Sequence, residues 1–201
     1  MFSIRNIRAV HSQRRFATLV LSEHFEGKLA NNLSNVLSAV KHFKDDKVDV
    51  LVHGNACAEQ VEEVKKYKGI NKIYFANNPD LQNPYGDAIV QLTKKLVETN
   101  NYDKVVAASS GFGKDVIPRL GGLLDVQPIT DVIEIIDAGA KFKRPIYAGN
   151  AVATVSTSDS IKLLTVRTTN FDRQDKGAAA AYATEEVSFD NKEIKGKWLE
   201  N

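Results

Sequence analysis

The segment Val105–Asp131, VVAASSGFGKDVIPRLGGLLDVQPITD, decides the fold. It begins with a short apolar run, Val105–Ala108, and continues through a turn that contains glycines. A stretch with helical spacing follows, which Pro118 is expected to break, and a polar turn then leads back into apolar residues. A short apolar run is typical of a strand that is buried on both faces of a parallel sheet. The segment therefore predicts a strand, a helix broken by proline, and a return to the sheet.

The same alternation of strand and helix fills the chain before this segment. Strands are expected at Thr18–Leu21, Val48–Val52, Ile73–Phe75 and Val105–Ala108, and helices at Lys28–Phe43, Ala58–Tyr67 and Tyr85–Glu98. Parallel strands need crossover connections, and right-handed crossovers place helices on both faces. The pattern predicts an α/β fold, with a doubly wound and mostly parallel sheet between two helical layers.

The pattern changes after Thr130, because strand-like runs follow one another without a helix between them. These runs are Val132–Ile136, Phe142–Tyr147, Ala151–Val155 and Ile161–Val166. We expect them to form antiparallel strands that extend or cover the sheet. Residues 174–201 are Ala-rich and then charged, with few apolar anchors. We interpret them as a strand or tail that packs on the domain of residues 17–173, or as a linker.

Composition limits the class of protein. The chain has 201 residues, of which 43% are hydrophobic and 26% are charged, as expected of one folded domain. No apolar run approaches the roughly 20 residues that span a bilayer, so membrane insertion is not expected. Cys57 is the single cysteine, which excludes an internal disulfide and fits a reducing compartment.

The basic residues of the first sixteen positions explain the chain's positive charge. MFSIRNIRAVHSQRRF holds four of the 27 basic residues and no acid, which leaves 23 basic against 25 acidic residues in the rest. The remainder therefore shows no basic surface of the kind that binds nucleic acid. Residues 1–16 have the character of a mitochondrial transit peptide, with Arg14-Arg15-Phe16 before a cleavage site at Ala17, or they form a plain basic tail.

The turn Gly111-Phe112-Gly113-Lys114 invites a phosphate-loop interpretation, which the spacing does not support. A Walker loop needs Gly where Ala108 stands and Ser or Thr where Asp115 stands. A dinucleotide motif needs Gly at Val116. We therefore interpret the glycines as a strand-to-helix turn that permits positive φ and close packing of the helix on the sheet.

A weaker interpretation remains open at the same edge of the sheet. Ligands of doubly wound sheets bind beyond the carboxyl ends of the strands, at the switch point. If the first and fourth strands flank that point, one crevice is lined by Ser22, His24, Ser109, Ser110, Phe112, Gly113 and Lys114. Backbone N–H groups at the start of the next helix favour an anion there, so an adenine nucleotide would be compatible.

Other reactive residues form no recognisable catalytic or metal site. The histidines lack HExxH spacing and are interpreted as surface or cap residues, and Cys57 as a small, semi-buried residue. No serine belongs to a nucleophile elbow. Outside the leader, arginine occurs at only four positions: Arg119, Arg144, Arg167 and Arg173. Contacts to a partner and ion pairs within the domain are equally compatible with them.

Three blocks of the sequence resemble the N-terminal domain of the electron transfer flavoprotein alpha subunit. They are FGKDVIPRLGGLLDVQPITDVI from Phe112, RPIYAGNA from Arg144, and Val166-Arg167 ahead of Phe171-Asp172, in the family's order and spacing. The resemblance extends over Thr18–Asp172. It implies a nucleotide-binding-like α/β fold that belongs to an electron carrier and not to an enzyme.

The resemblance also implies partners and a cofactor. The family is a heterodimer of the mitochondrial matrix and of bacteria that passes electrons from acyl-CoA and other dehydrogenases to a membrane quinone oxidoreductase. Its beta subunit carries a structural AMP, and its FAD is held chiefly by a second alpha domain. The first alpha domain and the beta subunit together form a base for that FAD domain. Contacts to the beta subunit are expected at Phe112, Arg119, Asp131, Arg144, Tyr147 and Asn150.

The given sequence ends at Asn201, about where the FAD domain would start, so no flavin is expected on this chain alone. Three interpretations remain open: a shortened alpha subunit, a split gene whose FAD domain is a separate chain, or a relic that binds the beta subunit without redox function. A stand-alone module that binds an adenine nucleotide is the alternative from another functional class.

Overall fold

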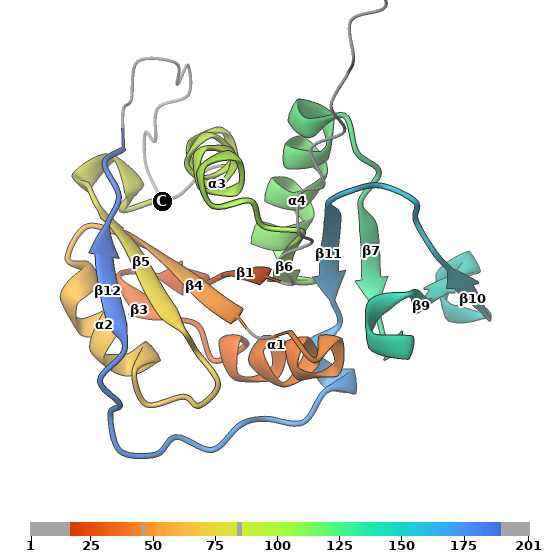
Figure 1. Cartoon of the computed structure of the whole chain (residues 1–201), viewed down its shortest axis with the longest axis horizontal. Helices are drawn as coiled ribbons and strands as arrows, with labels where there is room; N and C mark the ends of the chain where they lie inside the picture. The colour runs from red at the N-terminus through yellow and green to blue at the C-terminus, as the bar shows by residue number, and fades with distance from the viewer. Residues whose placement is uncertain (1–16, 46, 84–85, 190–201) are drawn as a thin grey trace, which may run out of the picture.

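A computed structural model describes residues 17–45, 47–83 and 86–189 of the chain. The proposed transit peptide lies outside these residues, as do Ile194 and Trp198. The described part forms three layers, with a parallel sheet between two pairs of helices (Figure 1). No helix among these residues combines the length and the apolar character needed to cross a membrane.

The main sheet has seven strands in the order β12-β5-β4-β1-β6-β11-β7, and every neighbouring pair is parallel. Their bounds are β1 Ala17–Leu21, β4 Lys47–Gly54, β5 Lys72–Asn77, β6 Lys104–Ala108, β7 Ile129–Val132, β11 Lys162–Val166 and β12 Ala183–Glu186. The central strands are continuously apolar because helices cover both of their faces. The prediction of a doubly wound, mostly parallel sheet is confirmed.

Helices α1 (Leu33–Val40) and α2 (Cys57–Val64) cover one face, and α3 (Gly86–Asn100) and α4 (Gly111–Leu124) cover the other (Figure 1). Successive residues of a strand point to opposite faces. Val50 and Val52 of β4 therefore join the core under α1 and α2, whereas Leu51 joins the core under α3 and α4. Alternate residues of β4 thus contribute to the cores on the two faces of the sheet.

Helix α4 passes through Pro118 without a break, contrary to the expectation of a broken helix. Proline removes one N–H donor and crowds the preceding turn, which weakens a helix. Here both flanks are held in place, because Val116, Ile117 and Leu120 are buried against the sheet and α3. The packing of these side chains outweighs the local preference of proline.

The expected helix Lys28–Phe43 is shorter than predicted. Residues 24–29 form a small hairpin of β2 (His24–Phe25) and β3 (Lys28–Leu29), and α1 begins at Leu33. The turn at Glu26 and Gly27 has positive φ in both residues, which a helix excludes. A short 3₁₀ helix, Lys41–Phe43, completes the predicted segment.

A second, three-stranded antiparallel sheet consists of β8 (Glu134–Ile136), β9 (Lys141–Ile146) and β10 (Ala151–Val155), in the order β10-β9-β8. We call residues 133–155 the arm, because β9 and β10 lie beyond β7 at one side of the main sheet (Figure 1). Phe142 of β9 is fully buried in the core under α1, where its ring meets that of Phe43 edge-on. The arm is thus anchored by one aromatic side chain.

Two of the predicted C-terminal strands differ from expectation. The predicted strand Val132–Ile136 is divided between β7 of the main sheet and β8 of the arm. The predicted antiparallel strand at Ile161–Val166 is β11, which is parallel to both β6 and β7 and lies between them. The arm, and not a helix, connects the parallel strands β7 and β11, so it returns the chain to the same end of the sheet before β11 starts.

Residues 172–187 run beneath α1 and α2 to the far edge of the sheet, where β12 pairs with β5 (Figure 1). The backbone of this segment donates to the end of α2, from Gly177 N to Lys66 O and from Ala180 N to Lys65 O. Val187 is buried in the core under α3. The segment from Gln174 to Phe189 is therefore packed on the domain in this structure.

Candidate functional site

The switch point of the sheet lies between β1 and β6. The chain moves outward from β1 through β4 to β5, and β6 then lies on the other side of β1. The carboxyl ends of β1 and β6 bring Ser22, Ser109 and Ser110 to one edge of the sheet. The condition on which the crevice prediction depends is therefore met.

At the switch point, polar groups form hydrogen bonds and ring contacts with other residues of the domain. Ser22 Oγ donates to Leu51 O at 2.8 Å, and His53 Nε2 lies 3.1 Å from Ser22 O. Because a carbonyl oxygen only accepts, Nε2 of His53 carries the proton. The His53 ring stacks on Phe112 with centroids 5.5 Å apart and lies 4.9 Å from the ring of His24. Phe112 therefore packs on the domain here.

His24 and His53 are buried, contrary to the expectation of surface or cap positions. Gln60 of α2 is buried beside them, and Nε2 of Gln60 and of His24 both lie 3.2 Å from where a Cβ on Gly54 would be. Neither Nδ1 of His53 nor the amide of Gln60 has a hydrogen-bond partner within the described residues. Burial lowers the pKa of His24, and burial together with the neighbouring His24 lowers the pKa of His53 to about 3. Both imidazoles are therefore neutral near pH 7.

The first turn of α4 is built for close packing on the sheet. A Cβ on Gly113 would lie 1.9 Å from Ala108 O, so only glycine fits there. This confirms the packing role predicted for the glycine turn, but neither Gly111 nor Gly113 has positive φ. Ser110 caps the helix, since its Oγ accepts from Gly113 N at 3.2 Å. The nucleotide crevice stays a prediction.

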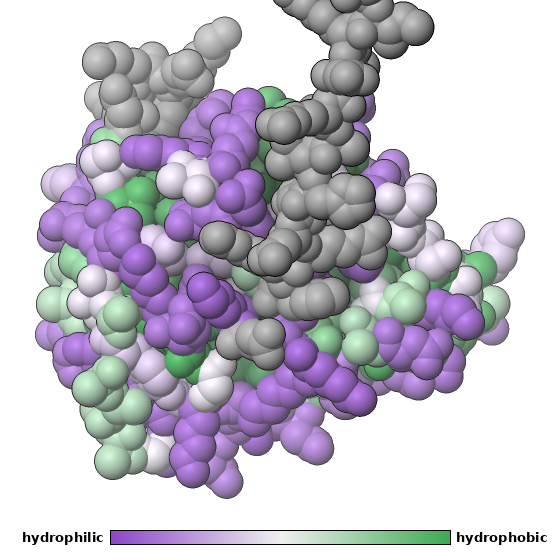
Figure 2. All heavy atoms as spheres, viewed as in Figure 1, coloured by the Kyte–Doolittle hydropathy of each residue, from purple (hydrophilic) through white to green (hydrophobic). Residues whose placement is uncertain are grey.

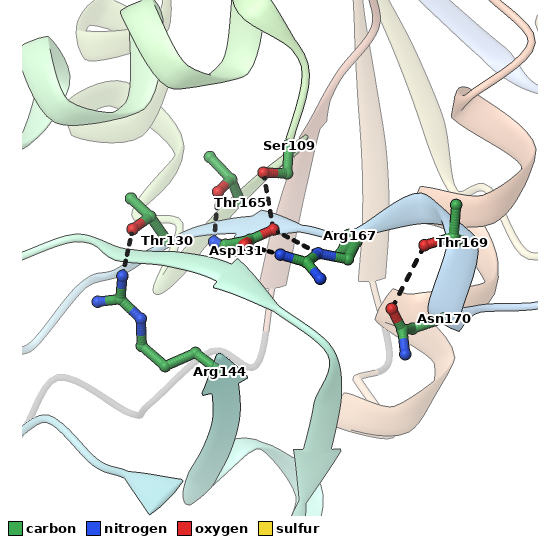
Figure 3. Close-up of polar contacts among 8 residues, drawn as sticks. All are labelled: Ser109, Thr130, Asp131, Arg144, Thr165, Arg167, Thr169 and Asn170. Atoms are coloured by element: carbon green, nitrogen blue, oxygen red, sulfur yellow. Dashed lines mark hydrogen bonds and ion pairs between the residues drawn. The ribbon is translucent and has the colours of Figure 1, made fainter. Parts of the chain in front are cut away.

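Asp131 of β7 is the centre of a polar cluster that joins the carboxyl ends of β6, β11 and β7 (Figure 3). Its carboxylate accepts from Arg167 Nε at 2.9 Å and from a second guanidinium nitrogen of Arg167, and from Ser109 Oγ at 3.2 Å. Its backbone N–H donates to Thr165 Oγ1 at 2.8 Å. The hydrogen bonds from Arg167 hold the pKa of Asp131 below its usual value.

The backbone at Asp131 sends the chain from the main sheet into the arm. Leu164 pairs with Ile129 and Val166 with Val132, so β7 holds one more residue than β11 over this interval. Asp131 has φ +62°, a left-handed conformation that aspartate tolerates better than most residues. This bulge bends the strand toward β8. The ion pair to Arg167 fixes that bend.

Arg144 of β9 reaches back toward the same strand. Its Nη2 donates to Thr130 Oγ1 at 3.0 Å (Figure 3). Its Nε is enclosed without a hydrogen-bond partner, and no acidic side chain pairs with Arg144 in the part of the chain that is described. Arg144 of β9 thus contacts Thr130, the residue before Asp131 on β7, so two of the predicted contact residues lie near the same bend.

The outer turn of the arm exposes an aromatic side chain. Tyr147 is 79% exposed, and Val152 on β10 is 56% exposed. Tyr147 and Ala148 have φ of +50° and +54°, values that non-glycine residues adopt at an energetic cost. Asn150 follows in the same turn and is exposed. In the space-filling view, the arm carries hydrophobic, weakly polar and strongly hydrophilic residues side by side (Figure 2).

Arg119 lies apart from this cluster, on the outer face of α4. Its guanidinium pairs with Asp115 at 2.6 Å and with Asp87 of α3 at 2.7 Å. For Arg119 and Arg167 the structure shows the ion pairs within the domain that were one of the two alternatives. The expected contact residues therefore occupy separate places. Arg119 is on α4, where it pairs with α3. Four others lie on or beside the arm: Asp131, Arg144, Tyr147 and Asn150.

Reactive groups elsewhere give no further site. No set of three metal-ligating His, Cys, Asp or Glu side chains occurs among residues 17–45, 47–83 and 86–189. Cys57 is buried more fully than expected, and burial raises the pKa of its thiol to about 11. Sequence reasoning missed Gln60 and Thr165. Thr165 could have been noticed as a polar residue within an apolar strand, whereas Gln60 carries no such signal.

Comparison with known proteins decides the family. The family model described as "Electron transfer flavoprotein domain" matches residues 18–192. The chain belongs to the electron transfer flavoprotein family. The match covers both faces of the main sheet, the arm and β12, so the whole described domain is the electron transfer flavoprotein domain.

Similar proteins carry the name of the alpha subunit. The chain is 31% identical over 183 residues to "Electron transfer flavoprotein subunit alpha, mitochondrial" of Dictyostelium discoideum, covering 88% of this chain and 51% of that protein. The probable mitochondrial alpha subunit of Cryptococcus neoformans var. grubii is 39% identical over 80% of this chain and 47% of its own length. The alpha subunit of Pseudomonas aeruginosa is 38% identical over 86% and 54%. The chain thus spans about half the length of these relatives.

Proposed function

We propose that this chain is the scaffold half of a mitochondrial electron transfer flavoprotein and docks a beta-type subunit. The observation that carries the proposal is the family match over residues 18–192, together with relatives named as alpha subunits. In the complex, electrons would pass from acyl-CoA and other dehydrogenases to a quinone oxidoreductase of the respiratory chain. The site of action would be the mitochondrial matrix, as the names of the eukaryotic relatives suggest for the organelle.

FAD would be the cofactor of that complex, held by a domain outside residues 17–189. The switch point supports this division, because Phe112 stacks on His53 and Gly113 lies against Ala108 O. FAD would supply the redox chemistry when bound. The role of the residues described here would be to hold the partner in position.

The arm is the surface that best fits the docking of a partner. It places Tyr147 on a strained turn, with Val152 exposed on the neighbouring strand. Exposed tyrosine beside aliphatic and arginine side chains is the composition of an interface hot spot. The anchor at Phe142 and the ion pair between Asp131 and Arg167 hold this surface in one orientation before binding.

A binding experiment tests the proposal directly. The beta subunit from the same organism would be mixed with this chain, and the complex measured by size-exclusion chromatography with light scattering. We expect one complex of one copy of each chain. Tyr147→Ala should weaken binding by about 2 kcal/mol or more. Glu59→Ala, at an exposed position of α2 on the other face of the sheet from Arg119, is the control and should bind as the wild type does. Two separate peaks for the wild-type chains would contradict the proposal.

A further inference from the structure

We infer that Arg144 binds a carboxylate on the beta-type subunit, so that the partner carries an Asp or Glu that faces the arm. The inference rests on the proposed docking and adds the chemistry of the contact. It follows from three features of Arg144: an oriented guanidinium, an incomplete set of hydrogen bonds, and a local excess of positive charge.

The guanidinium of Arg144 is oriented by one hydrogen bond, but other N–H groups of it have no acceptor among the described residues. Nη2 donates to Thr130 Oγ1 at 3.0 Å, which fixes the direction of the side chain. Nε is enclosed and has no partner, and Nη1 makes no hydrogen bond to any residue in the described ranges. An arginine side chain carries five N–H donors and no acceptor; with Nε enclosed and one Nη2 donor used, the donors left for an acceptor from outside the domain are those of the terminal nitrogens. A negatively charged acceptor would therefore stabilise the half-buried guanidinium of Arg144 strongly.

The surroundings of Arg144 carry more positive than negative charge. Asp131, the residue after Thr130, is already held by Arg167 through two guanidinium nitrogens. Lys114 acts electrostatically on the same carboxylate. One aspartate therefore faces Arg167 and Lys114, and the charge of Arg144 is left unbalanced. Glu134, the acid on β8 of the arm, pairs with Lys143 at 2.8 Å.

A protein carboxylate fits this place better than a free anion. Arg144 lies on β9, three residues before Tyr147, and its cross-strand neighbour is Ala153 on β10. Val152 pairs with Pro145 and therefore points to the opposite face of the arm. A partner that covers Tyr147 at the end of β9 and extends over the face that carries Arg144 would exclude water from Arg144, which strengthens an ion pair there. An isolated small anion would gain none of this apolar contact.

The test measures the affinity of the recombinant beta subunit for this chain by calorimetry, at low and at high salt. We expect Arg144→Gln to raise the Kd by about 30-fold or more and to flatten its salt dependence. Arg144→Lys, which keeps the charge but loses the planar fork, should show a smaller loss. Arg173→Gln, at an exposed arginine, is the control and should bind as the wild type does.

A charge exchange separates a direct contact from a structural role. Arg144→Glu should abolish binding, and an Asp→Arg or Glu→Arg variant of the beta subunit at the matching position should restore it. Circular dichroism would first show that each variant is folded. If the wild type binds but Arg144→Gln binds equally well, or if no acidic position restores binding, the inference is wrong and the docking proposal stands. If the wild-type chains do not bind, both are wrong.

Discussion

At the scale of single residues, Gly113 controls how closely helix α4 packs on strand β6. A Cβ there would lie 1.9 Å from the backbone oxygen of Ala108, which cannot move as a side chain can. We expect Gly113→Ala to lower the free energy of unfolding by about 3 kcal/mol. Gly122→Ala in the same helix has open space and should stabilise the domain by up to about 1 kcal/mol. Urea denaturation of both variants measures the difference.

The buried histidines predict how stability depends on pH. His53 has a folded-state pKa of about 3 against 6.5 in the unfolded chain, and the pKa of His24 is also lowered. The unfolded state therefore binds more protons in acid. The contribution of His53 to stability is complete above about pH 6.5 and is lost as the pH falls toward 3, by up to about 1.4 kcal/mol per pH unit, and His24 acts in the same direction.

Chemical denaturation between pH 7.5 and 4 tests this pH dependence. His53→Phe keeps an aromatic ring against Phe112 but cannot titrate, so its stability should fall less steeply below pH 6.5. The exposed His42 provides the control, and His42→Gln should keep the wild-type slope. An equal slope in the wild type and in His53→Phe would contradict the assignment of the effect to His53.

At the scale of elements, the arm depends on the one aromatic ring that it inserts into the core. Phe142 is fully buried, so Phe142→Ala should cost about 3–5 kcal/mol. Amide hydrogen exchange should show the largest loss of protection in β8, β9 and β10, with β1 and β4 less affected. Val152→Ala, at an exposed position of the same sheet, should leave exchange unchanged. A uniform loss across both sheets would mean that the arm is not a separate unit of stability.

The elements also show where sequence reasoning succeeds and where it stops. The strands β1, β4, β5 and β6 were predictable because continuous apolar runs are typical of strands covered on both faces. The parallel direction of β11 was not predictable, because parallel strands are usually joined by a helix. Here the arm makes the crossover instead. Pro118 was predicted to break α4 from its local preference, but the burial of its neighbours decides the outcome.

The candidate site was predictable in its members more than in their arrangement. Asp131 and Arg144 were both expected to contact a partner; the structure places Asp131 at the bend of β7 and Arg144 on β9, with a hydrogen bond to the neighbouring Thr130. The burial of His24 and His53 was not expected, because their polarity favours the surface and their cover comes from distant Gln60 and Phe112. Contacts between residues far apart in the chain leave no local pattern.

At the scale of the whole molecule, the described part of the chain is a parallel sheet covered by helices on both faces, with the arm at one side. The two cores are complete on either face of the sheet, whereas the arm keeps an exposed tyrosine and an unbalanced arginine. A domain with buried cores and an arm with exposed side chains is the arrangement that the proposed docking of a second subunit requires. Calorimetry with AMP and ATP should accordingly give no heat on the isolated chain, and a saturable heat would favour the nucleotide-binding alternative.

The central claim is that this chain works as the scaffold of a two-subunit electron carrier. The most direct measurement is to purify the tagged protein from cells of its own organism, identify the chains that accompany it by mass spectrometry, and record the flavin absorbance of the eluate. We predict a beta subunit in equal amount, with flavin absorbance that follows a chain holding the FAD domain. A preparation without any beta subunit would contradict the claim.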